Sequence, residues 1–339
     1  MITTVIIRLL RAQLVTTSLF AQAHWTKYER NPVLTVGDSG AWDSRAVAHS
    51  AVIYDGRMYQ IWYTASDGKQ RGIGHATSPD GVNWTKDIAN PVLDVGADGT
   101  WDSKSMYASA VRFDSTRQDS KRYQMWYTGL ADSIARVGHA MSPDGTTWMK
   151  DSTNPVLDVG APGSWDNGGV GDASILFNGS TYKMWFLGGD KPIFSHGKIR
   201  IGYATSRDGL TWTKADSLNP VFDVGGAGTW DSQFVFGANV FSDSSWSDST
   251  RYRMFYDGGY AVNPRIGYAT SPDGIHWKRY RGNPVVDWGP PGAWDSQALL
   301  NASIVYDGRS YGMWYTGHGG GHSGIGYATS PPDSTSRDR

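Results

Sequence analysis

Apolar and polar residues alternate with a period of two in short runs along the chain. At residues 59–64, Tyr, Ile and Tyr alternate with Gln, Trp and Thr, and residues 123–128 repeat the pattern. No segment keeps an apolar period of 3.6 over the 11 or more residues that a helix needs. Turn signals such as Asp55-Gly56 and Pro79-Asp80-Gly81 separate the runs. The pattern predicts short antiparallel strands joined by tight turns.

One unit with a fixed order of motifs occurs five times. It runs from Asn-Pro-Val through Trp-Asp, an aromatic pair and Ile/Val-Gly-His/Tyr-Ala to Ser-Pro-Asp-Gly-x-x-Trp, and successive copies start 59 to 65 residues apart. The five copies begin at Asn31, Asn90, Asn154, Asn219 and Asn283. A four-stranded sheet of ~60 residues cannot bury both faces alone, so the copies must stack. We therefore predict an all-β fold, a five-bladed β-propeller with four antiparallel strands per blade, in a single domain over residues 24–333.

The two ends of the chain complement each other. The fifth copy lacks the closing Trp strand, and residues 24–27 (His-Trp-Thr-Lys) match the closing strands at 83–86 and 211–214. The N-terminal strand is predicted to close the last blade and so remove the open sheet edges. Residues 334–339 have no place in this ring and are predicted to be disordered.

The first 23 residues differ from the rest. They contain no acid, carry Arg8 and Arg11, and end on Ala-Gln-Ala after a short apolar run, which is typical of a secretory signal peptide. A disordered leader from a misplaced start is the alternative, and two arginines argue against a membrane span. The expected location is secreted or periplasmic.

Composition excludes several classes of protein. The absence of Cys rules out a disulfide scaffold, a thiolate metal site and a cysteine nucleophile. The net charge of −1 gives no reason to expect nucleic acid or a membrane surface as partner. No cofactor is expected; no His/Asp spacing demands a metal, although a metal in the channel stays possible. We expect a monomer.

Residues that recur in all five copies are expected to serve the blade, with the Trp of Trp-Asp wedged between blades and the Asp capping a loop. Function is expected where the repeats differ at one end of the central channel. Seven residues beyond each Trp-Asp, the aligned positions are His49, Ala108, Asp172, Gly237 and Asn301. The polar members of this set predict a broken polar ring at the floor of a funnel. The preceding residues, which include Tyr107 and Phe236, are expected to face a neighbouring blade.

Further candidates lie around this ring. Asp257 stands where other copies have Thr or Leu, and Asp190, His318 and His322 are each unique to their blades. Farther out lie Arg45, Lys104, Gln233 and Gln297. The loops between the second and third strands also diverge, at residues 66–71, 130–136, 189–198, 258–265 and 318–323. A single loop His is more often only solvated than catalytic, but several unlike residues around one channel favour a site.

Residues 24–330, which carry these motifs, resemble the five-bladed β-propeller glycoside hydrolase superfamily, which includes families 43, 32, 130 and 117. The resemblance implies an enzyme that hydrolyses O-glycosyl bonds of an oligo- or polysaccharide in the central funnel. In the arabinanase and invertase branches it also implies an Asp/Asp/Glu set. Asp172 matches the second Asp, whereas His49 and Gly237 occupy the positions of the base and the acid. The usual set is therefore absent.

A glycosidase still needs one group that protonates the leaving oxygen and another that activates water or attacks. We expect Asp172 to be the base, or to tune it, with Asp257 as a second carboxylate and His49 or His318 as proton donor. Arg45, Lys104, Asn301, Gln233, Gln297, Asp190 and His322 are expected to bind the sugar. The alternative from another class is a non-catalytic, lectin-like propeller that holds a glycan without cleaving it.

Overall fold

The structure is a computed structural model that describes residues 24–192, 195, 197–242, 247–260 and 263–331. The expected signal peptide and the expected disordered tail lie outside these residues. The described chain consists of β-strands joined by turns and loops, and its one helical element is a short 3-10 helix, η2 (Asp248–Thr250). The all-β class expected from the period-two pattern is confirmed.

Each repeat forms three long antiparallel strands and a short outer one. The innermost strands are β3 (Ala46–Tyr54), β7 (Ser105–Phe113), β11 (Gly169–Phe177), β15 (Phe234–Ser242) and β19 (Ala298–Tyr306). The second strands are β4 (Tyr59–Ser66), β8 (Tyr123–Ala131), β12 (Tyr182–Gly189), β16 (Tyr252–Tyr260) and β20 (Tyr311–Gly319). The third strands are β5 (Arg71–Ser78), β9 (Ile134–Ser142), β13 (Ile199–Ser206), β17 (Asn263–Ser271) and β21 (His322–Ser330). The outer strands are β6 (Thr85–Lys86), β10 (Met149–Lys150), β14 (Thr213–Lys214), β18 (Lys278–Arg279) and β1 (Thr26–Lys27).

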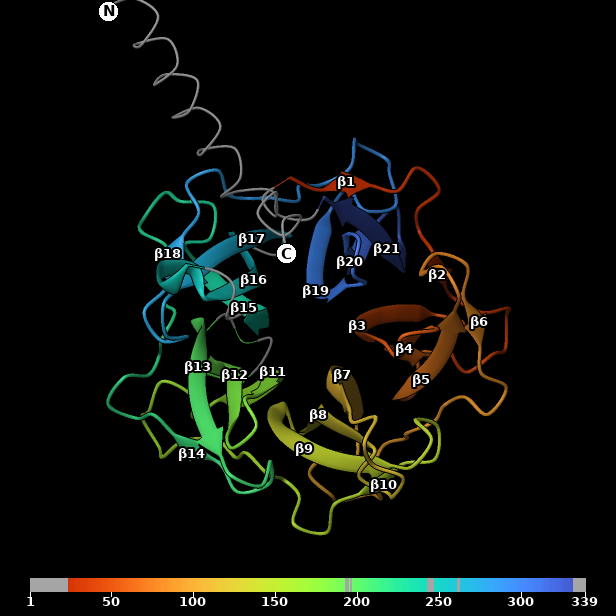
Figure 1. The fold of residues 1–339 in the computed structure, drawn as a ribbon, viewed down its shortest axis with the longest axis horizontal. Helices are drawn as coiled ribbons and strands as arrows, with labels where there is room; N and C mark the ends of the chain where they lie inside the picture. The colour runs from red at the N-terminus through yellow and green to blue at the C-terminus, as the bar shows by residue number, and fades with distance from the viewer. Residues whose placement is uncertain (1–23, 193–194, 196, 243–246, 261–262, 332–339) are drawn as a thin grey trace, which may run out of the picture.

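The sheets are arranged around a common centre, with the first strand of each repeat innermost (Figure 1). These innermost strands contact one another in a cycle, from β3 to β7, β11, β15 and β19 and back to β3. The third and fourth repeats count as one hydrogen-bonded sheet because a single parallel bridge, Ile199 to Phe234, joins β13 to β15. The arrangement is that of a propeller.

The N-terminal strand completes the sheet of the last repeat, as expected. Strand β1 pairs with β21 in the register Thr26–Thr329 and Lys27–Ala328, and a further strand, β2 (Leu34–Thr35), also pairs with β21. Lys27 donates to Asp295, the buried Asp of the fifth Trp-Asp motif, at 2.6 Å. In the other repeats the outer strand supplies an equivalent Lys or Arg, in the pairs Lys86–Asp43, Lys150–Asp102, Lys214–Asp166 and Arg279–Asp231. The Asp of the motif is structural, and its side chain joins the outer strand to the rest of the sheet.

In four of the five repeats, a tryptophan of the second strand joins the repeat to the next one. These four side chains are fully buried, and each donates its indole N–H to the Gly carbonyl of the Ser-Pro-Asp-Gly turn (Ser-Arg-Asp-Gly in the third repeat) of the following repeat. The bonds run from Trp62 to Gly145, Trp126 to Gly209, Trp185 to Gly274 and Trp314 to Gly81, at 2.7–2.9 Å. The fourth repeat has Phe255 instead, and the sequence of the repeat after it has no such glycine turn. Phe255 packs edge-on against Trp25 of the N-terminal segment, with ring centroids 5.4 Å apart.

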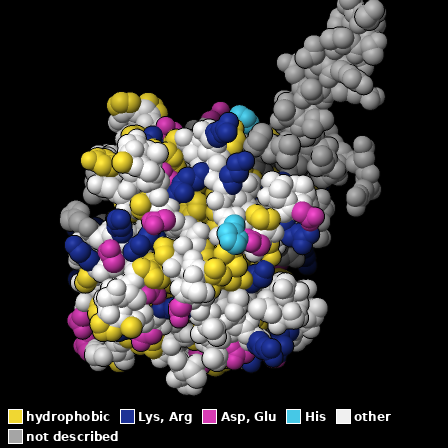
Figure 2. All heavy atoms as spheres, turned by 90° about the vertical axis from the view of Figure 1, so that its left-hand side faces the viewer, with side chains coloured by type: hydrophobic (Ala, Val, Ile, Leu, Met, Phe, Trp, Pro, Cys, Tyr) yellow, Lys and Arg dark blue, Asp and Glu magenta, His cyan; other side chains and the backbone are white. Residues whose placement is uncertain are grey.

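The outer surface carries mixed charge. Basic and acidic side chains are interspersed over the face in Figure 2, in agreement with the net charge of −1. No helix in the described part of the chain is long and apolar enough to cross a membrane.

Candidate active site

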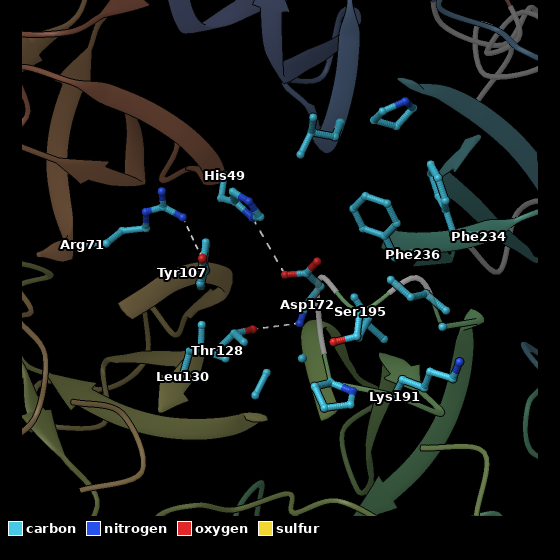
Figure 3. Close-up of a pocket in the computed structure, with 18 residues that line it drawn as sticks. His49, Arg71, Tyr107, Thr128, Leu130, Asp172, Lys191, Ser195, Phe234 and Phe236 are labelled. Atoms are coloured by element: carbon cyan, nitrogen blue, oxygen red, sulfur yellow. Dashed lines mark hydrogen bonds and ion pairs between the residues drawn. The ribbon is translucent and has the colours of Figure 1, made fainter. Parts of the chain in front are cut away.

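A cavity of about 530 Å³ receives lining residues from all five repeats (Figure 3). Its wall is mostly apolar, with Leu130, Leu187, Phe234 and Phe236 among the larger side chains. The polar and charged side chains are few, and they include His49, Arg71, Tyr107, Asp172 and Lys191. A mostly apolar cavity of this size with a few polar groups is typical of a small-molecule site.

The expected polar ring sits on a shared irregularity of the innermost strands. Each of these strands has a register shift, at the ring position in four strands and one residue beyond it in β7, which is the mark of a β-bulge. His49, Asp172 and Asn301 adopt left-handed backbone conformations there, with φ of 41°, 43° and 52°, and Gly237 has φ of 57°. A bulge inserts one residue and re-aims its side chain. Non-glycine residues in this region of φ/ψ space are strained and cluster at functional sites.

Side chains from the second strands hold this backbone in place. Thr128 Oγ1 accepts the backbone N–H of Asp172 at 2.8 Å, and Thr316 Oγ1 accepts that of His49 at 2.8 Å. In the same way Asp257 Oδ2 accepts the backbone N–H of Asn301 at 2.7 Å. Each bond links one repeat to the next, so the ring position is fixed between neighbouring sheets.

His49 and Asp172 face each other in the cavity, with Nδ1 and Oδ1 3.8 Å apart (Figure 3). Both side chains are mostly buried, at 16% and 12% exposure. Burial, the positive charge of Arg71 and that of His318 lower the pKa of His49 to about 3. Burial raises the pKa of Asp172 to about 6, against a hydrogen bond from the Asn301 side chain that lowers it. The order of these pKa values is opposite to the one expected from sequence: near neutral pH the imidazole is uncharged, and the carboxyl is the group able to hold a proton.

Asp257 lies behind the cavity wall. Its side chain is fully buried, it is absent from the lining, and its Oδ1 has no hydrogen-bond partner among the described residues. Burial and the charge of Asp172 raise the pKa of this carboxyl well above its usual value, although the N–H of Asn301 lowers it. The structure thus places Asp257 as a support of Asn301, in the position that Thr has in other repeats.

Replacing Asp257 by Thr should preserve the fold, because a hydroxyl can still accept the N–H of Asn301. Replacing it by Leu should cost about 1–3 kcal/mol, because that N–H loses its partner. Urea unfolding of the two variants measures the difference. Equal destabilisation of the two variants would contradict the role of Asp257 as a hydrogen-bond acceptor.

The other candidates fall into two groups. Asn301 lines a second, small cavity of about 20 Å³, which Asp172 also lines. His318 is half-buried and is not among the lining residues of either cavity; burial, and after it the charge of Arg71, lowers its pKa. The remaining candidates line neither cavity. Arg45, Lys104, Gln233, Gln297 and His322 are exposed, and Asp190 lies 3.9 Å from Arg200 in an ion pair.

Several lining residues were not among the sequence candidates. Arg71 and Lys191 lie at divergent loops, so the variability of those loops was the available signal. Tyr107 and Phe236 were expected to face a neighbouring blade, yet they line the cavity. Within the described residues, no group of three or more His, Asp or Glu side chains is placed to hold a metal ion.

Comparison with known proteins gives one family and one fold. No family model matches the chain. The Mycobacterium tuberculosis protein Rv1502 is 30% identical over 288 residues, which cover 81% of this chain and 88% of that protein. A β-1,2-mannobiose phosphorylase of Thermoanaerobacter sp. is 29% identical over 119 residues, covering 31% of this chain and 37% of the enzyme.

Solved structures resemble the whole molecule. A complex of BT0996 with RGII has a TM-score of 0.72 at 18% identity, covering 96% of this chain and 97% of that protein. A structure from the GH130 family of mannoside phosphorylases, which contains glycoside hydrolases that target β-1,2-mannosidic linkages, has a TM-score of 0.69 at 18% identity, covering 91% and 94%. A thermostable family-43 glycoside hydrolase has a TM-score of 0.63 at 19% identity, covering 87% and 91%. The chain therefore belongs to the family of the M. tuberculosis protein Rv1502, and its fold is that of the propeller glycoside hydrolases of families 43 and 130.

Proposed function

We propose that this protein is a glycosidase that cleaves an oligo- or polysaccharide in the central cavity, with Asp172 as the proton donor. One observation carries the proposal: Asp172 is the only carboxylic acid among the described residues that line the cavity, and its pKa is raised to about 6. A carboxyl group with a raised pKa can donate a proton at nearly neutral pH.

A single carboxylic acid is enough for the proposed hydrolysis, because water takes the place of the leaving oxygen and the solvent returns the proton. Asp172 gives its proton to the bridging oxygen while the bond from that oxygen to the anomeric carbon breaks. Water bonds to the anomeric carbon and releases a proton to the solvent, from which Asp172 is reprotonated. His49, uncharged at neutral pH, orients the carboxyl or a sugar hydroxyl. The apolar wall at Phe234 and Phe236 gives the sugar ring a surface to pack against.

We also propose that five blades surround the site and form one closed ring. The cycle of contacts between the innermost strands supports five blades closed into one ring by strand β1. The signal-peptide-like sequence of residues 1–23 supports action outside the cytoplasm. We further propose that the ligand is a glycan and that the protein is a monomer.

A glycan panel tests the proposal. Purified protein is incubated with neutral and acidic oligosaccharides, with and without inorganic phosphate, and the products are separated by chromatography. Release of free reducing sugar without phosphate is the expected result. Release of a sugar phosphate only when phosphate is present would replace hydrolysis by phosphorolysis. Binding of a glycan with no cleavage would assign the lectin-like alternative.

The pH dependence tests the role of Asp172. If the protonated carboxyl is the active form, kcat/KM should be high below pH 6 and fall about tenfold per pH unit above it. His49 has a pKa of about 3, so its titration should cause no further change in kcat/KM between pH 5 and 8. A rate that rises through pH 6 would instead make Asp172 the base.

A further inference from the structure

One cavity-lining position breaks the repeat pattern by carrying a positive charge. When the repeats are aligned by the pairing of their second and third strands, Arg71 of β5 is equivalent to Ala135, Ile199, Pro264 and Ser323. All but the last of these line the cavity. The first repeat thus places a guanidinium where the others place a small or apolar side chain.

Arginines at the neighbouring position of the third strand differ from Arg71 in that each is paired with an aspartate. One residue further along the third strand, three repeats carry an arginine paired with an aspartate. The pairs are Arg136–Asp158 at 2.6 Å, Arg200–Asp190 at 3.9 Å and Arg265–Asp287 at 3.6 Å. Adjacent residues of a strand point to opposite faces, so Arg71 lies on the other face from this row. Among the described residues, no carboxylate forms an ion pair with Arg71.

The contacts of Arg71 are with the hydroxyl and the ring of Tyr107. Its Nη1 donates to the hydroxyl of Tyr107 at 2.7 Å, and its guanidinium lies 5.1 Å from the centre of that ring. The Tyr107 ring in turn packs against His49, with centroids 4.9 Å apart (Figure 3). Arginine has five N–H donors, so the hydrogen bond to Tyr107 leaves most of the fork available. Burial, and after it the positive charge of Arg71, lowers the pKa of both His49 and His318.

We infer that Arg71, together with Tyr107 and His49, forms a subsite for an oxyanion at one side of the cavity. The oxyanion is either the carboxylate or sulfate of an acidic sugar, or a free phosphate ion. A guanidinium binds such groups through two parallel hydrogen bonds in a planar fork. The half-buried position strengthens the attraction, because water screens it less than at the surface. This inference rests on the proposed function, since it names the chemistry of what enters the same cavity.

Ligand binding to the Asp172→Asn variant tests the inference without turnover. Isothermal titration calorimetry and ligand-observed NMR are run with glucuronate, glucose 6-sulfate, inorganic phosphate and neutral glucose. Each probe is also titrated into variants that add Arg71→Gln, Arg71→Lys or Arg136→Gln. The last is the matched control, because Arg136 sits one aligned position away and pairs with an exposed aspartate. Thermal unfolding confirms that each variant is folded.

At least one oxyanion probe should bind about tenfold or more tightly than glucose, and Arg71→Gln should remove this preference. Arg71→Lys should keep part of it, and Arg136→Gln all of it. Preference for the two sugar acids identifies an acidic glycan, and preference for phosphate alone identifies a free anion. If no oxyanion is preferred over glucose, or if Arg71→Gln keeps the preference, the subsite is wrong. Binding is measured here without cleavage. If the glycan panel shows no hydrolysis, the binding experiment therefore still decides whether the oxyanion subsite exists.

Discussion

An Asp172→Asn variant should lose turnover on the glycan substrate by about 10²–10⁴-fold while it remains folded. The amide has nearly the size of the carboxyl and can stay beside His49, but it has no acidic proton to give to the leaving oxygen. The backbone N–H of residue 172 still donates to Thr128, so the bulge that positions the side chain is kept. Substrate affinity should change far less than kcat, because the lost interaction is needed in the transition state.

Initial rates with the most active glycan of the panel measure this effect, and urea unfolding shows whether the variant is folded. The control is Asp158→Asn, at an aspartate of the repeated set whose side chain is 57% exposed and pairs with Arg136. This control should keep nearly full activity. A folded Asp172→Asn variant that retains turnover would remove Asp172 from the chemistry and with it the proposed mechanism.

A Trp126→Ala variant should lose about 3–5 kcal/mol of unfolding free energy. The indole is fully buried between the second and third repeats, and its N–H bond to Gly209 ties the two sheets together. Trp126→Phe should cost less, because an aromatic ring still fills the space and mainly the hydrogen bond is lost. Phe255 occupies the same position in the fourth repeat, where the sequence of the following repeat offers no glycine turn.

Chemical denaturation of the two Trp126 variants separates packing from hydrogen bonding. Met149→Ala is a suitable control, because Met149 is 52% exposed and its truncation should stay within about 0.5 kcal/mol. Equal stability of wild type and Trp126→Ala would show that the buried tryptophans do not hold neighbouring sheets together.

The repeats made much of the fold predictable. Period-two alternation and the turn motifs gave the strands, and the match of residues 24–27 to the other closing strands gave the pairing of β1 with β21. The aligned ring was also informative, because His49, Asp172 and Asn301 all sit on equivalent bulges with left-handed backbone. A repeat fixes equivalent positions in space, so a polar residue that breaks the repeat is visible before any coordinates are known.

The chemistry of the site was less predictable, because it depends on burial. Sequence placed Asp257 among the catalytic carboxylates, and the structure puts it behind the wall as an acceptor for Asn301. Sequence also favoured a histidine as proton donor, whereas burial leaves His49 neutral and raises the pKa of Asp172. Desolvation depends on every neighbouring sheet, and no local motif encodes it.

The sequence by itself determined the all-β units, their order and the pairing of β1 with β21, because these follow from local patterning repeated at a nearly constant spacing. Only the tertiary structure decided which unlike residues share a cavity. Arg71, Tyr107 and Asp172 come from three different repeats, and their proximity results from the packing of one sheet against the next. The same packing removes water from these side chains, and this raises the pKa of Asp172 and places the positive charge of Arg71 in the cavity wall.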